Sequence, residues 1–525
     1  MAPRVLIADK LFPAAIDIFK ARGVEADVKT GLTKDELLKI IGDYDGLAVR
    51  SATKADKDVL AAAKNMKVIG RAGIGVDNVD IPAATAAGVV VMNTPFGNSI
   101  TTAEHAIALM FALARQLPVA DQSTQAGKWE KNRFMGVELY AKTLGLIGAG
   151  NIGSIVADRA IGLKMKVVAY DPFLSPERAV EIGVEKVELD DLLARADFIT
   201  LHTPLTDKTR NILSREALAK TKKGVLIVNC ARGGLVDEQA LRDGLDSGAI
   251  GGAAFDVFVE EPAKQNVLFG APNFIATPHL GASTNEAQEN VALQVAEQMS
   301  DYLLTGAVTN ALNSPSVSAD EAPKLKPFVT LAEKLGALAG QMVDFGIKSI
   351  DIAYEGDVAA LNVKPLTAAA LAGLLRPMLA EVNMVSAPAV AKERGITISE
   401  SRQDNSPVYD SLMRITVTTE LGKRAFAGTL IGGGARVVEV KGMELDAAFM
   451  PSMLYVSNLD KPGFIGALGT LLSEAGVNIA TFNLGRRAEG EDAICLVGVD
   501  QAPTEALLER VKGLAHVKEA RALVF

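Results

Sequence analysis

The sequence predicts an α/β protein of several domains, on three observations. A chain of 525 residues, at about 100–200 residues per domain, divides into three or four domains. Short apolar runs alternate with helical patterns over residues 1–315, which is typical of parallel sheets covered by helices. Residues 452–525 follow the order β-α-β-β-α-β, which is that of a ferredoxin-like fold.

The most informative segment is residues 142–171, which begins KTLGLIGAGNIG. An apolar strand meets a glycine turn, a helical pattern follows, and a second apolar run ends at Asp171. Gly148 permits the tight turn, Gly150 lets a pyrophosphate approach the backbone, and Gly153 lets the helix pack on the strand. Asp171 would accept hydrogen bonds from ribose hydroxyls and repel a 2′-phosphate. The segment therefore predicts a Rossmann-type unit that binds NAD; a purely structural turn is the alternative.

The bulk composition excludes several classes of function. The net charge of −9 argues against nucleic acid as a partner. Cys230 and Cys495 are too few for a disulfide framework, so we expect a reducing cytoplasm. The first residues, MAPRVLIADK, have the pattern of a strand, and the apolar stretch Leu366–Leu375 is too short to cross a bilayer. We expect no membrane association and no metal site.

The chain divides by pattern into four parts. A long helical pattern, Thr101–Leu117, is followed by Pro118, and another covers Ser283–Leu304. If the second helix returns to the first unit, a cleft for substrate lies between two domains. Ala311–Pro327 is rich in serine, proline and charge, which predicts a linker. The predicted domains are a substrate-binding domain (1–98 and 286–315), an NAD-binding domain (99–285), an intervening α+β domain (317–450) and a ferredoxin-like domain (452–525).

Three side chains in the second half of the NAD unit fit the oxidation of an alcohol. His279 directly precedes a helix, and its imidazole would take the hydroxyl proton; a capping or packing role is the alternative. Glu261 would fix the tautomer of His279 and raise its pKa, although consecutive acids also suit a solvated face. Arg232 follows an apolar strand and would clasp a carboxylate, or else pair with Asp237.

Other candidates have simpler interpretations. His105 lies inside an apolar helical pattern, and His202 ends a predicted strand, so packing is favoured for both. Cys230 is interpreted as a small buried residue. The run Gly432–Gly434 is interpreted as a turn between strands, because no Lys-Ser/Thr pair opens a helix after it.

Several segments together resemble the D-isomer-specific 2-hydroxyacid dehydrogenases: GAGNIGSIVADRA, LHTPLTDKTRNIL, NCARGGLVDEQAL, AFDVFVEEP and TPHLGAST. The resemblance implies a Rossmann-type domain inserted in a flavodoxin-like domain, and a catalytic set of Arg232, Glu261 and His279. It implies that Asp256 holds the nicotinamide carboxamide. The other residues that it places around the cofactor are Asn151, Ile152, Asp171, Thr203, Cys230 and Ala231.

Three segments of the first domain are similar to those of particular family members: VRSATK, GRAGIGVDNVD and NTPFGNS. These members oxidise 3-phospho-D-glycerate to 3-phosphohydroxypyruvate at the entry to serine synthesis. The likeness implies that Arg50 and Arg71 meet the substrate phosphate. It also implies reduction of 2-oxoglutarate as a side activity and a homotetramer, with a dimer as the alternative. A hydroxypyruvate or glyoxylate reductase, and a non-catalytic NAD or amino-acid sensor, are the rival interpretations.

Long members of this family carry an intervening allosteric domain and a C-terminal ACT domain, which fit residues 317–450 and 452–525. ACT domains bind amino acids at a strand-to-helix turn. The resemblance places Asn458, Asp460 and Asn478 at the positions of serine ligands, so L-serine is the expected effector. Some relatives carry an aromatic residue or a histidine where this chain has Asn458.

Overall fold

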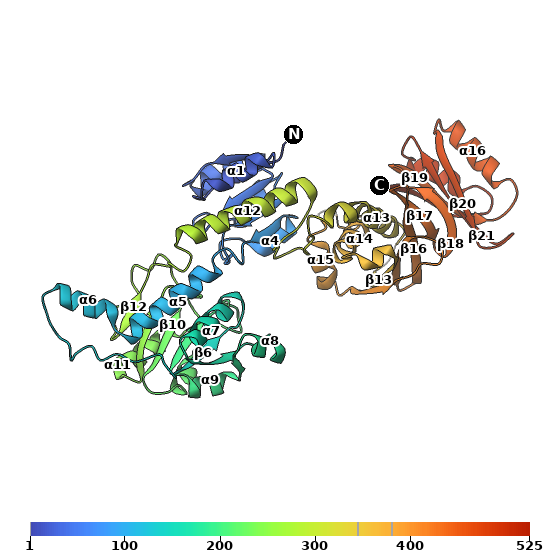
Figure 1. Cartoon of the computed structure of the whole chain (residues 1–525). Coiled ribbons are helices and arrows are strands. Elements are labelled where there is room, and N and C mark those ends of the chain that lie inside the picture. The colour runs from blue at the N-terminus through green and yellow to red at the C-terminus, as the bar shows by residue number, and fades with distance from the viewer. Residues whose placement is uncertain (1, 344–345, 380–381) are drawn as a thin grey trace.

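A computed structural model describes residues 2–343, 346–379 and 382–525 as four sheets with covering helices (Figure 1). Met1 of the predicted first domain, and residues 344–345 and 380–381 of the predicted intervening domain, lie outside the described residues. The α/β fold class is confirmed, because two wholly parallel sheets are followed by a mixed sheet and an antiparallel one.

The first sheet has the strand order β2-β1-β3-β4-β5 and is parallel, which is the flavodoxin-like arrangement. Its strands are β1 (Arg4–Ile7), β2 (Glu25–Val28), β3 (Gly46–Val49), β4 (Val68–Arg71) and β5 (Val90–Asn93). One face packs on α1 (Ala14–Ala21) and α12 (Asn285–Thr305). The other packs on α2 (Lys34–Ile40), α3 (Lys57–Ala62) and α4 (Ile81–Ala86).

The second sheet is also parallel, in the order β12-β11-β10-β9-β6-β7-β8. Its strands are β6 (Thr143–Ile147), β7 (Lys166–Tyr170), β8 (Glu185–Lys186), β9 (Phe198–Leu201), β10 (Val225–Asn229), β11 (Ile250–Phe255) and β12 (Phe274–Ala276). Buried side chains of α5 (Ser99–Ala114), α7 (Asn151–Gly162) and α8 (Pro176–Glu181) share one core. Those of α9 (Leu189–Arg195), α10 (Arg215–Ala219) and α11 (Glu238–Ser247) share the other.

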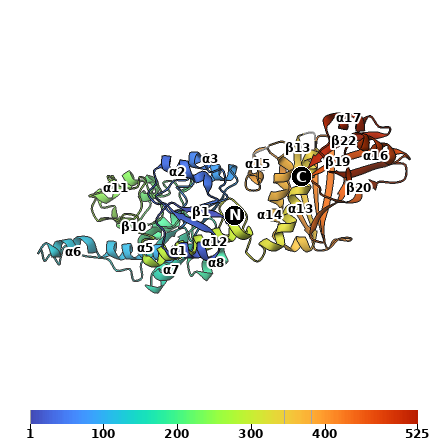
Figure 2. The same ribbon diagram turned by 90° about the horizontal axis from the view of Figure 1, so that it is seen from above.

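The predicted helix Thr101–Leu117 is wrong at its C-terminal end. Helix α5 ends at Ala114, Gln116 has a left-handed backbone (φ 51°), and α6 (Leu117–Gln125) begins with Pro118 in its first turn. A proline ring clashes with a continuing helix but fits the first turn of a new one. Figure 1 shows α6 projecting from the body at the far end of α5, and Figure 2 shows the same projection from above.

Helix α12 returns the chain to the first sheet, as the sequence predicted. Thr284 caps it by accepting a hydrogen bond from Ala287 N–H. The helix lies so close to β4 that a Cβ atom on Gly70 would fall 2.2 Å from Met299 Sδ. Helices α5 and α12 thus connect the two parallel sheets (Figure 1).

The third sheet has the order β14-β13-β15-β16-β17-β18. Its strands are β13 (Ile347–Gly356), β14 (Thr397–Gln403), β15 (Ser411–Thr419), β16 (Gly422–Ile431), β17 (Gly434–Val440) and β18 (Met443–Ala448). The predicted glycine turn joins β16 to β17. Helices α13 (Ala322–Gln341), α14 (Lys364–Leu375) and α15 (Ala387–Glu393) accompany the sheet.

The predicted linker Ala311–Pro327 is wrong in its second half, because α13 begins at Ala322. Ser318 and Glu321 hydrogen-bond reciprocally just before this helix, and Pro323 in its first turn needs no N–H partner. Helices α13 and α14 pack closely, since a Cβ atom on Gly336 would fall 2.1 Å from Ala370 O.

The fourth sheet is antiparallel with the order β20-β21-β19-β22, which is the predicted ferredoxin-like arrangement. Its strands are β19 (Ser452–Leu459), β20 (Ile479–Arg486), β21 (Asp492–Val499) and β22 (Val517–Val524), with helices α16 (Phe464–Glu474) and α17 (Glu505–Lys512). Strand β20 packs against β18, where a Cβ atom on Gly485 would fall 2.4 Å from Glu444 O. Among the described residues, no helix is both long and apolar enough to cross a membrane.

Candidate active site

The glycine turn between β6 and α7 has the shape that a pyrophosphate site requires. Gly148 has a φ of 94°, and a Cβ atom there would fall 2.5 Å from His202 O. A Cβ atom on Gly153 would fall 2.1 Å from Gly148 O, whereas one on Gly150 would meet open space. No side chain caps the N-terminus of α7, so its first N–H groups remain available to an anion.

Asp171 follows β7 beside this turn. Its carboxylate accepts hydrogen bonds from Ala149 N–H at 2.9 Å and from Phe173 N–H at 2.8 Å. The acid therefore holds the glycine turn. Asn151 and Ile152 begin α7. The other predicted cofactor residues follow the carboxyl ends of β9, β10 and β11 in the same parallel sheet: Thr203, Cys230, Ala231 and Asp256.

His279 and Glu261 are in contact. His279 Nδ1 lies 2.6 Å from Glu261 Oε2, and Glu261 Oε1 accepts a hydrogen bond from Phe258 N–H. The bond to Glu261 raises the pKa of His279, although burial opposes the rise. Burial would raise the pKa of Glu261, but the bonds from His279 and Phe258 hold it below its ordinary value. With Nδ1 donating to the carboxylate, Nε2 of the half-exposed ring is free to exchange a proton.

The loop that carries His279 is fixed by Asp256, whose side chain is fully buried. The carboxylate accepts hydrogen bonds from Thr277 Oγ1 (2.6 Å), Leu280 N–H (2.7 Å) and Gly281 N–H (2.8 Å). Such anchoring fits the backbone of His279, which has a φ of 58°, rare for a residue with a side chain.

Three arginines from two different sheets face the same region. Arg71 ends β4, Arg50 follows β3 and Arg232 lies two residues beyond Cys230, past the end of β10. Burial lowers the pKa of Arg71 to about 10, and the positive charges of Arg232 and Arg50 add to this. Arg71 Nε is buried without a partner in the described structure. Guanidinium groups that repel one another, one of which has a buried Nε with no partner, are a site for an anion.

This region also contains two carboxylates, those of Asp77 and Asp9. The sequence analysis did not single out either of them. Asp77 accepts a 3.1 Å hydrogen bond from Arg232 Nε and thus joins the two domains. Asp9 accepts a hydrogen bond from Arg50 N–H at 2.7 Å and from Thr53 Oγ1 at 2.6 Å. Asp9 follows β1 just as Arg50 follows β3, so its position at a strand end was the available signal.

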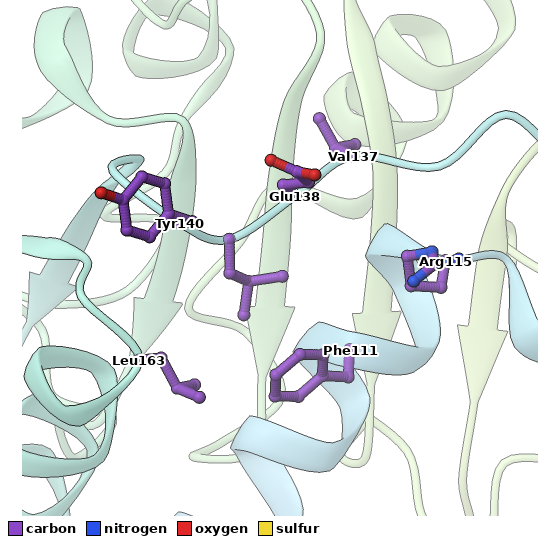
Figure 3. A pocket seen from close by; sticks show the side chains of 7 residues that line it. Phe111, Arg115, Val137, Glu138, Tyr140 and Leu163 are labelled. Atoms are coloured by element: carbon purple, nitrogen blue, oxygen red, sulfur yellow. The ribbon is translucent and has the colours of Figure 1, made fainter.

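A separate surface recess of about 420 Å³ lies away from these residues (Figure 3). Phe111 and Arg115 come from the end of α5, and Val137, Glu138 and Tyr140 come from the segment before β6. None of the predicted site residues lines this recess, so it is not part of the candidate active site.

Comparisons with known proteins agree with this geometry. Residues 107–281 match the model of the D-isomer specific 2-hydroxyacid dehydrogenase NAD binding domain. Residues 324–441 match the D-3-phosphoglycerate dehydrogenase intervening domain, and residues 452–516 match the ACT domain. A protein of Synechocystis named D-3-phosphoglycerate dehydrogenase is 44% identical over 98% of this chain and 94% of its own length. One of Archaeoglobus fulgidus with the same name is 43% identical over 98% and 99%.

The chain belongs to the D-isomer specific 2-hydroxyacid dehydrogenases. Solved structures of relatives match part of its length. A protein of Thermus thermophilus is 35% identical, with a TM-score of 0.55, over 59% of this chain and 99% of its own. A glyoxylate reductase of Paecilomyes thermophila is 31% identical, with a TM-score of 0.55, over 59% and 98%.

This dehydrogenase uses NAD. Its glycine turn is open at Gly150, and Asp171 holds the turn through the N–H of Ala149. In its ACT domain, the three predicted serine ligands contact different neighbours. Asp460 bonds to Arg486 Nη1 at 2.9 Å, and Asn478 Nδ2 donates to Asp500 at 2.7 Å. Asn458 is buried and donates to Leu459 O, while its Oδ1 has no partner in the described structure.

Proposed function

We propose that this dehydrogenase oxidises 3-phospho-D-glycerate with NAD to 3-phosphohydroxypyruvate, the first step of the phosphorylated route to L-serine. The observation that carries the proposal is the cluster of Arg50, Arg71 and Arg232. The hydrogen-bonded pair of His279 and Glu261 lies within electrostatic range of Arg232 in this cluster. A substrate with a carboxylate at one end and a phosphate at the other neutralises such a cluster. Relatives of matching length and name support this choice of substrate.

The residues divide the chemistry among them. His279 Nε2 takes the hydroxyl proton from C2, while Glu261 holds Nδ1 and keeps the ring oriented and basic. Arg232 binds the carboxylate and stabilises charge that develops on the C2 oxygen, and Arg50 and Arg71 bind the phosphate. When bound, NAD accepts the hydride from C2. Closure of the two domains would exclude water.

The cofactor site that we propose follows one sheet edge. Gly148, Gly150 and Gly153 surround the pyrophosphate, and Asp171 binds the ribose. Asp256 faces the nicotinamide carboxamide. The other cofactor contacts are Asn151, Ile152, Thr203, Cys230 and Ala231.

The domain bounds that we propose are residues 1–98 with 286–315, 99–285, 317–450 and 452–525. For regulation, we propose L-serine at Asn458, Asp460 and Asn478. The buried Asn458 Oδ1, which lacks a donor, supports a ligand with an ammonium group there.

We propose a homotetramer in the cytoplasm, with a dimer as the alternative. Large apolar side chains are exposed at the end of α5, along α6 and in the segment before β6: Phe111, Leu117, Val119, Trp129, Met135, Val137 and Tyr140. Of these, Phe111, Val137 and Tyr140 line the recess of Figure 3. Exposed apolar surface of this extent is typical of a subunit interface.

The test is NAD reduction with 3-phosphoglycerate and with unphosphorylated D-glycerate, with and without L-serine. We expect turnover with the phosphorylated acid, inhibition by serine, and far weaker turnover with D-glycerate. Equal rates on both acids would instead favour a hydroxypyruvate or glyoxylate reductase, the activity named for one structural relative. No turnover with either acid, nor in reverse with 2-oxoglutarate, would favour a non-catalytic sensor.

A further inference from the structure

His105, which the sequence analysis interpreted as a packing residue in an apolar helix, makes polar contacts. Its Nε2 lies 3.3 Å from Asp256 Oδ1 and 3.3 Å from Thr277 Oγ1. The Asp256 side chain is fully buried, and burial alone would raise its pKa. Hydrogen bonds from His105, Thr277 and the Leu280 N–H hold that pKa below its ordinary value, so the group is a buried anion.

The same helix holds the catalytic loop at a second point. Thr102, one turn before His105 on α5, donates a 2.7 Å hydrogen bond to Gly281 O. Asp256 binds the N–H of Gly281 at 2.8 Å. Helix α5 and the buried carboxylate therefore bind the C=O and the N–H of Gly281, in the segment that follows His279.

We propose that His105 is a positioning residue that supplies the positive counter-charge to Asp256 at the nicotinamide end of the site. It thereby sets the ratio between the Kd of NAD⁺ and the Kd of NADH. The inference rests on the proposed function in one respect: the place of Asp256 beside the nicotinamide comes from it.

The physical reason is charge balance in a buried place. The nicotinamide ring of NAD⁺ carries a positive charge that balances the negative charge of Asp256. The ring of NADH is neutral, so in that complex only His105 can balance the charge of the carboxylate. A positive charge on His105, whose Nε2 lies beside this carboxylate, therefore stabilises the reduced complex more than the oxidised one. The hydride and the hydroxyl proton of the substrate take no part in this step.

The other ionisable groups around Asp256 come from neighbouring strands. Cys230, after β10, stays neutral because burial and the charge of Asp256 raise the pKa of its thiol. Glu261 and His279, on the loops after β11 and β12, lie within electrostatic reach. Variants that keep all three of these side chains isolate the contribution of His105.

The experiment measures the Kd of NADH by fluorescence and the Kd of NAD⁺ by calorimetry, in the full-length enzyme and in His105→Gln. We expect the Kd of NADH to rise about three- to tenfold more than that of NAD⁺. Equal changes in both Kd values, or none, would overturn the proposal.

Thr277→Val is the matched control, because it removes a hydrogen bond to Asp256 without removing a charge. It should weaken both cofactor forms alike. In an Asp256→Asn background, His105→Gln should no longer change the ratio of the two Kd values; a persisting change would contradict the assigned partner. Turnover of 3-phosphoglycerate by the wild type, measured in parallel, tests the proposed function independently.

Discussion

The two halves of this molecule treat their charged residues differently. In the first two sheets, the arginines at the proposed substrate site repel one another, and Asp256 is buried against a histidine. In the last two sheets, partly buried charges are compensated in pairs: Lys441 binds Glu519 at 2.7 Å, and Arg414 binds Glu439. Charges held without compensation are stabilised when a ligand supplies the missing partner. The contrast fits the proposed catalytic site in the first half and the proposed regulatory site in the second.

The largest expected effect comes from the catalytic histidine, tested against a histidine of the other half. His279 and His516 both have left-handed backbones, with φ of 58° and 70°, which asparagine tolerates. His279→Asn should lower kcat about 100- to 10,000-fold, because the general base is lost. His516→Asn should leave kcat unchanged. Steady-state kinetics with circular dichroism as a check on folding make the comparison, and substantial turnover in His279→Asn would refute the mechanism.

Replacing one uncompensated arginine should separate affinity from stability. Arg71→Gln should raise the KM for 3-phosphoglycerate about 10- to 100-fold, since a charge-assisted bond to phosphate is lost. It should also raise the apparent Tm of the ligand-free enzyme, because a cation repelled by Arg50 and Arg232 is removed.

The matched control is Arg436→Gln, in the second half, whose partner Asp446 lies at 2.7 Å. Here the KM should stay constant, and the Tm should fall slightly or not at all. Kinetics and thermal-shift assays provide both numbers. An unchanged KM in Arg71→Gln would show that the phosphate binds elsewhere.

The sequence predicted those parts of the site that lie within short motifs. The glycine turn, Asp171 and the strand-end residues Arg71 and Arg232 all follow local patterns. It could not predict contacts between distant segments, such as Arg232 with Asp77 or His105 with Asp256, because these depend on how helices and sheets pack. This is why His105 was interpreted as a packing residue.

Fold prediction failed where local pattern and tertiary environment disagree. Strand β14 was not predicted, because it is an edge strand whose polar sequence, TISESRQ, shows little burial. The break between α5 and α6 was missed because the apolar period continues through it, while the backbone turns at Gln116.

A pH profile distinguishes a working pair from a structural one. Oxidation requires neutral His279, so kcat/KM should rise with pH through the pKa of His279, which the hydrogen bond to Glu261 raises. Glu261→Gln removes the negative charge and should move this acid limb to lower pH. The reverse reduction requires protonated His279, so its rate should fall with rising pH, and its limb should move the same way. If the limbs of both pH profiles lie at the same pH in Glu261→Gln as in the wild type, the titration belongs to another group.

The smallest expected effect lies in the second half and concerns regulation alone. Asn478 stands before β20 and donates to Asp500 at 2.7 Å, so its amide is already oriented. Asn478→Ala should weaken serine inhibition about two- to tenfold, the worth of one hydrogen bond, and leave uninhibited turnover unchanged. Asp446→Asn, on the neighbouring sheet, is the control and should alter neither quantity. A change in uninhibited kcat in Asn478→Ala, with inhibition intact, would show that the two halves do not divide the work as their charges indicate.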